Sequence, residues 1–239
     1  MSGFIRSAVG GLFMMCAALS TTPSHAETKA ITFGSTNAAS SNFALAVAMN
    51  KAIKQELPNA NVSMIETGAS VDNIRRMTKK EIDFGLVMVD TELQAVEGKG
   101  PFKDKAVPDM AVLYVHDASS LQFVVRADAG VAQLNDLAGK RFSAGIRGSG
   151  AELLTRQIFA ELGITPNWVP GSIQDSVEGV RNRQLIGYAK YGAGSTGLDA
   201  TLRELLTSTP VTFLGFTPEQ KAKVLAKVQG VDFMTLPAN

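Results

Sequence analysis

The sequence predicts an α/β protein whose sheets are largely parallel. After residue 29, short strand-like runs alternate with amphipathic, helix-like segments, and such alternation is typical of α/β folds. Phe84–Val89 is almost continuously apolar, as expected of a parallel strand covered on both faces. With 239 residues, the chain is long enough to bury one large core or two smaller ones.

Residues 1–26 are predicted to be a signal peptide. Arg6 supplies the positive start, Ala8–Leu19 is apolar, and residues 24–26 resemble a small-residue cleavage site. The apolar run of 12 residues is shorter than the roughly 20 that a helix needs to span a bilayer. We therefore expect an exported product that does not itself span the membrane.

Composition excludes several classes of function. Without residues 1–26, the chain carries 22 basic and 22 acidic side chains. Nucleic-acid binding needs a basic surplus, so we expect no nucleic-acid partner. No cysteine remains in this part, which excludes disulfides, a thiolate nucleophile and a cysteine-based metal site. Its single histidine, His116, also disfavours a structural zinc site.

The first half of the chain is expected to hold four strands and three helices. The strands follow β-branched or continuous apolar runs, whereas the helices have amphipathic spacing and end near Pro58 or Gly98. The expected strands are Ala30–Gly34, Val62–Glu66, Phe84–Val89 and Met110–Val115, the last of them buried. The expected helices are Phe43–Leu57, Val71–Lys80 and Asp90–Glu97.

The second half repeats the alternation. Gly163 marks the end of one expected helix, and Pro218 lies in the first turn of the last helix. The expected strands are Leu121–Val125, Arg141–Ala144, Leu185–Tyr191 and Val211–Phe216. The expected helices are Ala151–Leu162, Ile173–Arg183, Leu198–Leu206 and Pro218–Val228.

A glycine-rich turn, Gly145–Gly150, joins a predicted strand to a predicted helix. Glycines let the backbone turn without a Cβ penalty, and the free N–H groups at a helix start bind anions. Arg147 within the turn adds a guanidinium that suits a carboxylate. Ser149 and Glu152 also fit a capping box, so the serine has a structural explanation as well.

Two further polar loops follow predicted strands, at residues 35–42 and 67–73. In parallel sheets, ligands bind at the carboxyl ends of strands beside helix N-termini. Helix capping, which contributes about 1 kcal/mol, also explains Ser70. Because three such loops occupy equivalent places in the topology, we expect them to form one ligand site.

Three features are informative together: these loops, the strand that ends in Asp90, and the run D-L-x-G-K-R followed by G-x-x-G-S-G. They resemble the TAXI group, which are the periplasmic solute receptors of TRAP transporters. The resemblance implies a type II periplasmic-binding-protein-like fold, with two α/β lobes and a cleft between them. It places the lobes at 27–117 and 118–216 and a last helix and tail at 217–239. It also implies a periplasmic receptor that hands a small carboxylate, a glutamate-like amino acid or a dicarboxylate, to a membrane permease.

The same resemblance implies the ligand contacts and no cofactor. Asp90 would face an ammonium group, and the glycine turn would hold the carboxylate. The sequence departs from the family at two places: Phe43 replaces the usual tyrosine, and residues 186–188 differ from the family's I-D-A run. The chain is also shorter than usual for the family, so a segment that returns to the first lobe is expected to be missing. The implied contacts are Ser35, Asn37, Asn42, Phe43, Thr67, Gly68, Ser70, Asn73, Asp90, Arg147, Gly148, Ser149 and Gly150.

Two alternatives stay open at this point. A periplasmic sensor for a signalling partner would use the same pocket. Residues 192–197 match G-x-G-x-x-G, and Glu219 follows about 20 residues on, as in a nicotinamide-binding fragment, although Glu219 begins a helix rather than ending a strand. The same glycine segment imitates a hydrolase nucleophile elbow, but His116 precedes Ser195, which is the wrong order for that triad.

Overall fold

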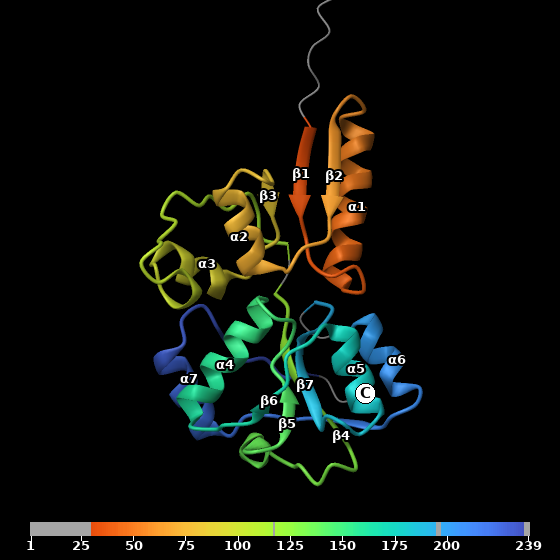
Figure 1. The fold of residues 1–239 in the computed structure, drawn as a ribbon, viewed down its shortest axis with the longest axis vertical. Coiled ribbons are helices and arrows are strands. Elements are labelled where there is room, and N and C mark those ends of the chain that lie inside the picture. The colour runs from red at the N-terminus through yellow and green to blue at the C-terminus, as the bar shows by residue number, and fades with distance from the viewer. Residues whose placement is uncertain (1–29, 117, 195–196, 237–239) are drawn as a thin grey trace, which may run out of the picture.

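The computed structural model describes residues 30–116, 118–194 and 197–236. Two α/β lobes follow one another along the chain and along the long axis of the molecule (Figure 1). The first lobe carries a three-stranded sheet and the second a five-stranded sheet. Residues 118–120 lead directly into the first strand of the second sheet.

The first sheet has the strand order β2-β1-β3 and is parallel throughout. Val71 and Ile74 of one helix pack with Ala95 and Phe102 to form its core. Its strands are β1 (Ala30–Gly34), β2 (Asn61–Ile65) and β3 (Phe84–Gly85). Its helices are α1 (Ser41–Glu56), α2 (Ser70–Thr78), α3 (Val89–Val96) and the 3₁₀ helix η1 (Gly100–Phe102).

The second sheet has the order β6-β5-β7-β4-β8 and is mixed. Strand β5 runs parallel to β6 and β7, but β4 runs antiparallel to β7 and β8. The expectation of largely parallel sheets is therefore wrong for this lobe. Its strands are β4 (Leu121–Arg126), β5 (Arg141–Ser143), β6 (Asn167–Trp168), β7 (Gly187–Tyr191) and β8 (Val211–Phe213).

Helices cover both faces of the second sheet. One face packs Phe123 and Phe142 against Phe159, and the other packs Tyr188 and Val124 against two more helices. The helices are α4 (Gly150–Leu162), α5 (Ile173–Arg181), α6 (Ala200–Leu206), α7 (Pro218–Lys227) and the 3₁₀ helix η2 (Leu134–Leu137).

Helix α7 extends the second lobe. Pro218 lies in its first turn, as the sequence predicts, and Thr217 and Gln220 form the capping box that starts it. Val224 and Val228 are buried in the same core as α4. The chain then turns back toward the first lobe, where Gly230 lies against α3.

Met110–Val115 is not the buried strand that the sequence predicts. The segment has no strand assignment, and Leu113 and Val115 are 68% and 72% exposed. A short apolar run has the same local signal whether or not a neighbouring strand is present to pair with it, and in the described part of the chain no strand pairs with this one.

The expected strand Phe84–Val89 is also too long. Only two of its residues form β3; Leu86 N still donates to Gly34 O at 2.9 Å, but side chains bind the main-chain groups that follow. Asn73 Nδ2 donates to Leu86 O at 2.8 Å, and Met88 N donates to Ser70 Oγ at 3.1 Å. Helix α3 then begins at Val89.

Across the described ranges, the helices are too short or too polar for any of them to cross a bilayer.

Candidate functional site

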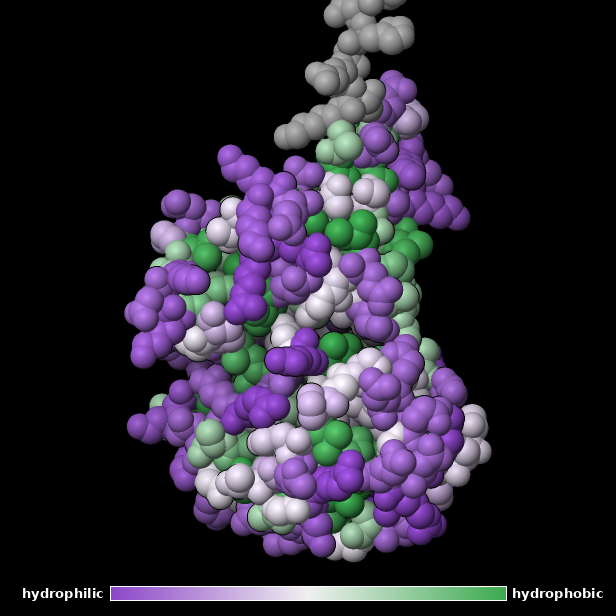
Figure 2. Space-filling model, in the orientation of Figure 1, coloured by the Kyte–Doolittle hydropathy of each residue, from purple (hydrophilic) through white to green (hydrophobic). Residues whose placement is uncertain are grey.

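The two lobes contact each other at the waist of the molecule (Figure 2), through residues near helix N-termini and through one pair of residues within α3 and α4. Val71 N in α2 donates to Gly148 O, before α4, at 3.3 Å. Gln174 Nε2 donates to Asn37 Oδ1, and Gln94 Nε2 donates to Gln157 Oε1, each at 3.3 Å. The predicted polar loops therefore lie at the contact between the lobes.

The loop after β2 is built mainly by hydrogen bonds within the first lobe. Thr67 Oγ1 and Asn73 Nδ2 each donate to Ser35 O at 2.8 Å. Ser70 Oγ accepts the hydrogen bond from Met88 N that is described above. Gly68 N donates to Asp72 Oδ2 at 3.0 Å. These predicted contact residues thus position the carboxyl ends of β1 and β3 in this structure.

The loop after β1 joins the lobes. Ser35 is buried, and its hydroxyl points toward Asn42 O at 3.5 Å. Asn37 Oδ1 accepts from Ala39 N at 3.0 Å in addition to Gln174, and Ala39 packs against the second-lobe core. Phe43 is partly buried at the start of α1.

The glycine turn already holds an anion, supplied by the chain itself. Gly148 N donates to Glu152 Oε2 at 2.7 Å, and Glu152 N donates to Ser149 Oγ at 3.1 Å. A carboxylate near a helix N-terminus is stabilised by the helix dipole and the free N–H groups. Arg147 is exposed and, among the residues described, has no hydrogen-bond or ion-pair partner.

Gly150 lets α4 approach α3 closely. A Cβ at this position would lie 2.8 Å from Met88 Cγ and 3.0 Å from Thr91 Oγ1. Even alanine would therefore push the first turns of the two helices apart. The contact brings the predicted Gly150 next to the predicted Asp90 in the fold.

A cavity of about 920 Å³ lies beside this contact, between the two lobes. It is bounded by the start of α3, the segment leading into β4, one face of α4, the ends of β7 and β8, α7 and the chain after it. Its lining residues that matter here are Asp90, Leu154, Ile158, Tyr191, Phe213, Phe216, Lys221, Asp232 and Phe233.

Asp90 is a buried carboxylate in the lining of that cavity. Its residue is 5% exposed, and its Oδ2 atom has no hydrogen-bond partner. Burial raises the pKa of this carboxyl from 3.8 to about 6. Burial and the Asp90 charge also raise the pKa of the Tyr191 hydroxyl well above its usual range.

Sequence reasoning found Asp90 but missed the rest of the cavity. Phe216 contacts Phe233 with ring centroids 4.8 Å apart, and Lys221 Nζ lies 5.7 Å from the Phe233 ring centroid. Tyr191 ends strand β7, a position that the strand-end rule for α/β sheets does single out. The aromatic residues of the tail carry no comparable local signal.

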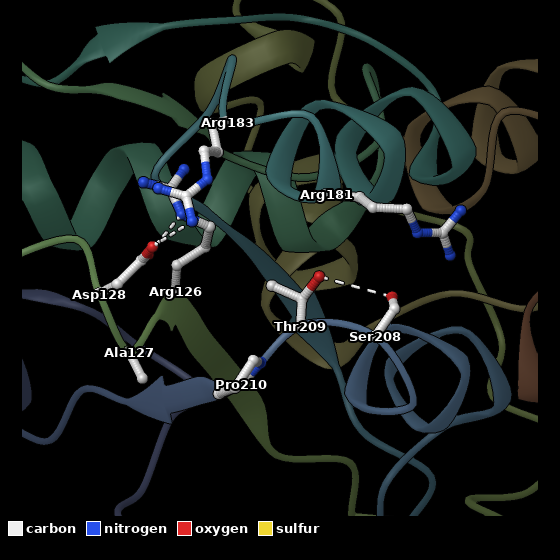
Figure 3. A pocket seen from close by; sticks show the side chains of 8 residues that line it. All are labelled: Arg126, Ala127, Asp128, Arg181, Arg183, Ser208, Thr209 and Pro210. Carbon is white, nitrogen blue, oxygen red and sulfur yellow. Dashed lines mark hydrogen bonds and ion pairs between the residues drawn. The ribbon is translucent and has the colours of Figure 1, made fainter.

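A second hollow of about 530 Å³ lies on the second lobe, between the end of β4, the end of α5 and the loop before β8 (Figure 3). Its arginines are engaged by the protein. Arg126 Nε lies 2.7 Å and Arg183 Nη2 2.9 Å from Asp128 oxygens, and Arg126 Nη1 donates to Leu185 O at 2.9 Å. The hollow is best explained as an ion-pair network that fastens β4 to the turn before β7.

The glycine segment 192–197 does not form a dinucleotide site in the described residues. Ala193 and Gly197 exchange two backbone hydrogen bonds, at 3.1 and 3.0 Å, while residues 195–196, including Ser195, lie outside the described residues. Asp199 caps α6 by accepting from Leu202 N at 2.8 Å and pairs with Lys190. A pyrophosphate would need this helix N-terminus, and a carboxylate occupies it.

Comparison with solved structures confirms the fold. The effector-binding domain of QuiR, in complex with shikimate, is 16% identical, with a TM-score of 0.55 over 80% of this chain and 81% of that one. An ancestral arginine-binding protein bound to arginine is 18% identical, with a TM-score of 0.51 over 79% of each chain. The periplasmic aliphatic sulphonate-binding protein SsuA from Escherichia coli is 14% identical, with a TM-score of 0.50 over 77% of this chain.

These similarities establish an α/β fold of the periplasmic-binding-protein type. The chain spans 56% of the length of the Escherichia coli protein. A family model described as NMT1-like matches residues 33–239, which is most of the chain. The chain belongs to the NMT1-like family.

Proposed function

We propose that this protein is a periplasmic solute-binding receptor that captures a small solute between its two lobes. The observation that carries this proposal is the cavity of about 920 Å³, which both lobes line. Its size is that of small-molecule sites, which are usually about 300–1,000 Å³ and mostly apolar with a few polar groups. The solved structures of the same fold described above include proteins that bind sulfonates, shikimate and arginine.

The finer proposal is a receptor of a TRAP-type secondary transporter that takes a small carboxylate, either a glutamate-like amino acid or a dicarboxylate. The TAXI-like motifs support the transporter class. Arg147 supports the carboxylate, because this exposed residue precedes Gly148, whose carbonyl accepts a hydrogen bond from the first lobe. A guanidinium without a protein partner is well suited to bidentate carboxylate binding.

The test is a thermal-shift screen of amino acids and dicarboxylates, followed by Arg147→Ala. A ligand that binds the folded state raises its stability by RT ln(1 + [L]/Kd). We expect a carboxylate to raise the melting temperature, and Arg147→Ala to lose most of that rise. Arg203→Ala, which removes an exposed arginine from α6, is the matched control. Equal ligand response in Arg147→Ala and the control would refute the carboxylate site.

A ligand sensor is the second candidate. It is favoured by the match to the QuiR effector-binding domain, which this chain covers over 81% of its length. The two roles are distinguished by ligand uptake in cells that lack the gene. Loss of uptake supports the transport receptor, whereas a changed transcriptional or signalling response with normal uptake supports the sensor.

A further inference from the structure

We propose that residues 111–115 of the first lobe form a dimer surface, on which a second copy of this chain pairs through the same residues. The two segments run antiparallel about a two-fold axis at Leu113, so that the contact is the same on both copies. The inference assigns an interaction surface rather than a solute site. It therefore holds or fails independently of the receptor function proposed above.

The first argument is that the main chain of this segment has no hydrogen-bond partners. Among the described residues, no backbone–backbone hydrogen bond involves any residue from 110 to 116. The sequence Ala-Val-Leu-Tyr-Val is rich in the β-branched and aromatic residues that favour strands. A strand-forming segment with unpaired N–H and C=O groups is a template for another strand. Pro108 and Asp109 precede the segment and keep the pairing short, because proline cannot donate and charges disfavour edge pairing.

The second argument is the exposure of the side chains. The side chains from Val112 to Val115 are between 47% and 72% exposed. In the rest of the described chain, no two neighbouring large apolar residues are both exposed. Single exposed apolar residues are ordinary, whereas a contiguous apolar patch marks an interaction surface.

The exposures alternate along the segment, as expected of an extended chain with two faces. Leu113 and Val115 are the most exposed, at 68% and 72%. Tyr114 instead faces its own lobe, since its hydroxyl donates to Met49 Sδ of α1 at 2.7 Å. Residues 111, 113 and 115 therefore share one outward face, and Leu113 is at its centre.

A two-fold axis at Leu113 makes the segment complementary to itself. Leu113 then lies opposite the same residue of the second copy. Val112 lies opposite the second Tyr114, and aromatic and β-branched residues are a favourable cross-strand pair in antiparallel sheets. Ala111 lies opposite the second Val115, which places a small side chain against a larger one.

The area of this surface fits a second copy. With large side chains carrying roughly 150–250 Å² each, the exposed fractions from Val112 to Val115 amount to on the order of 400 Å² of apolar surface. Interfaces are about 56–65% apolar, so the whole contact would bury about 600–700 Å² per copy. Standard interfaces bury roughly 800 Å² per partner, and their total begins at about 1,200 Å². The apolar area is thus sufficient for a small symmetric dimer.

Sedimentation equilibrium between 1 and 100 µM tests the proposal. We expect the wild-type protein to form dimers in this range. Leu113→Lys is expected to raise the dimer dissociation constant at least tenfold, because like charges would face each other across the axis. Leu225→Lys changes an apolar residue of α7 that is 51% exposed, and this matched control is expected to dimerise as wild type. Both variants are expected to unfold in urea as wild type does, since neither side chain is buried.

A disulfide experiment tests the register. Cys16 is the single cysteine of the chain, so each variant carries Cys16→Ser and one introduced cysteine. Leu113→Cys is expected to form a cross-linked dimer under mild oxidation, because directly opposed residues have Cβ atoms about 4.5–5.5 Å apart. The two copies of residue 111 are four positions apart in this register, or about 13 Å. Ala111→Cys is therefore expected to cross-link at least tenfold more slowly.

Each outcome decides for or against the dimer. A wild-type protein that stays monomeric at 100 µM overturns the proposal, because the surface is then left to another segment or another protein. A dimer that persists in Leu113→Lys, or that Leu225→Lys weakens equally, also overturns it. Cross-linking through Ala111→Cys that is faster than through Leu113→Cys refutes the antiparallel register. Dissociation by Leu113→Lys alone supports the proposal, whichever solute the protein binds.

Discussion

Asp90→Asn is expected to stabilise the ligand-free protein above pH 6. The pKa of Asp90 is raised from 3.8 to about 6 by burial. Because one pKa unit corresponds to about 1.4 kcal/mol, ionising this group in the folded state costs about 3 kcal/mol. Asparagine has nearly the same shape and no charge, so the variant avoids this cost.

The pH dependence of this effect has a definite sign. The folded-state pKa lies above the unfolded-state pKa, so the unfolded chain loses its proton first as pH rises. Stability therefore falls between about pH 4 and pH 6 and stays lower above that range. At pH 4 the wild type and Asp90→Asn are expected to differ little, and at pH 8 the variant is expected to be more stable by up to about 3 kcal/mol.

Urea unfolding of both proteins at pH 4 and pH 8 measures this difference. Other carboxylates also titrate in this range, but they are common to both proteins and cancel in the comparison. In a melting experiment at pH 8, the gain corresponds to about 6–12 °C, since about 2–4 °C per kcal/mol is typical at this size. Glu92→Gln is the control. A variant that is less stable than wild type at pH 8, or a gain that is equal at both pH values, would refute the reasoning.

Two further predictions concern packing. Lys190→Met removes the ion-pair partner of the Asp199 carboxylate, whose side chain is only 2% exposed. We expect the free energy of unfolding in urea to fall by about 3–5 kcal/mol, because a buried charge is left unpaired. A loss no larger than that of Lys223→Met, which changes an exposed lysine, would contradict this. Gly150→Ala places a Cβ 2.8 Å from Met88 Cγ, so we expect a loss of about 1–3 kcal/mol and a larger radius of gyration by X-ray scattering. Gly215→Ala, where a Cβ meets nothing within 4 Å, is its control, and equal behaviour of the two variants would count against a lobe contact at Gly150.

Much of the fold follows from local sequence signals. The β-branched run Ala30–Gly34 is a strand with those bounds, and the pattern from Ala151 to Leu162 lies within α4, ended by Gly163 in the left-handed conformation. Both segments combine a clear period with a clear stop signal. Met110–Val115 shows the limit of this reasoning, because a strand also requires a neighbour, and the local pattern contains no information about one.

The meeting of the polar loops was predictable, whereas the cavity was not, because Asp90 is the one predicted contact residue in its lining. Polar loops at strand ends were expected to meet, and they lie together where the lobes touch. Which atoms satisfy each other depends on side-chain geometry: Glu152 takes the Gly148 N–H that was assigned to a ligand. The cavity walls were beyond local reasoning, since Tyr191, Phe216 and Phe233 come from separate segments that only the tertiary fold brings together.

The most direct test of the central claim, a solute bound between the lobes, is a melting experiment at pH 8 on wild-type protein and Arg147→Ala. The panel contains amino acids and dicarboxylates. At a hundred times its Kd, a bound ligand adds about 2.7 kcal/mol, or about 5–11 °C at this size. The account predicts that at least one compound raises the melting temperature of the wild-type protein by this amount, and that Arg147→Ala loses most of the rise. A cooperative transition that no compound in either class displaces would contradict it.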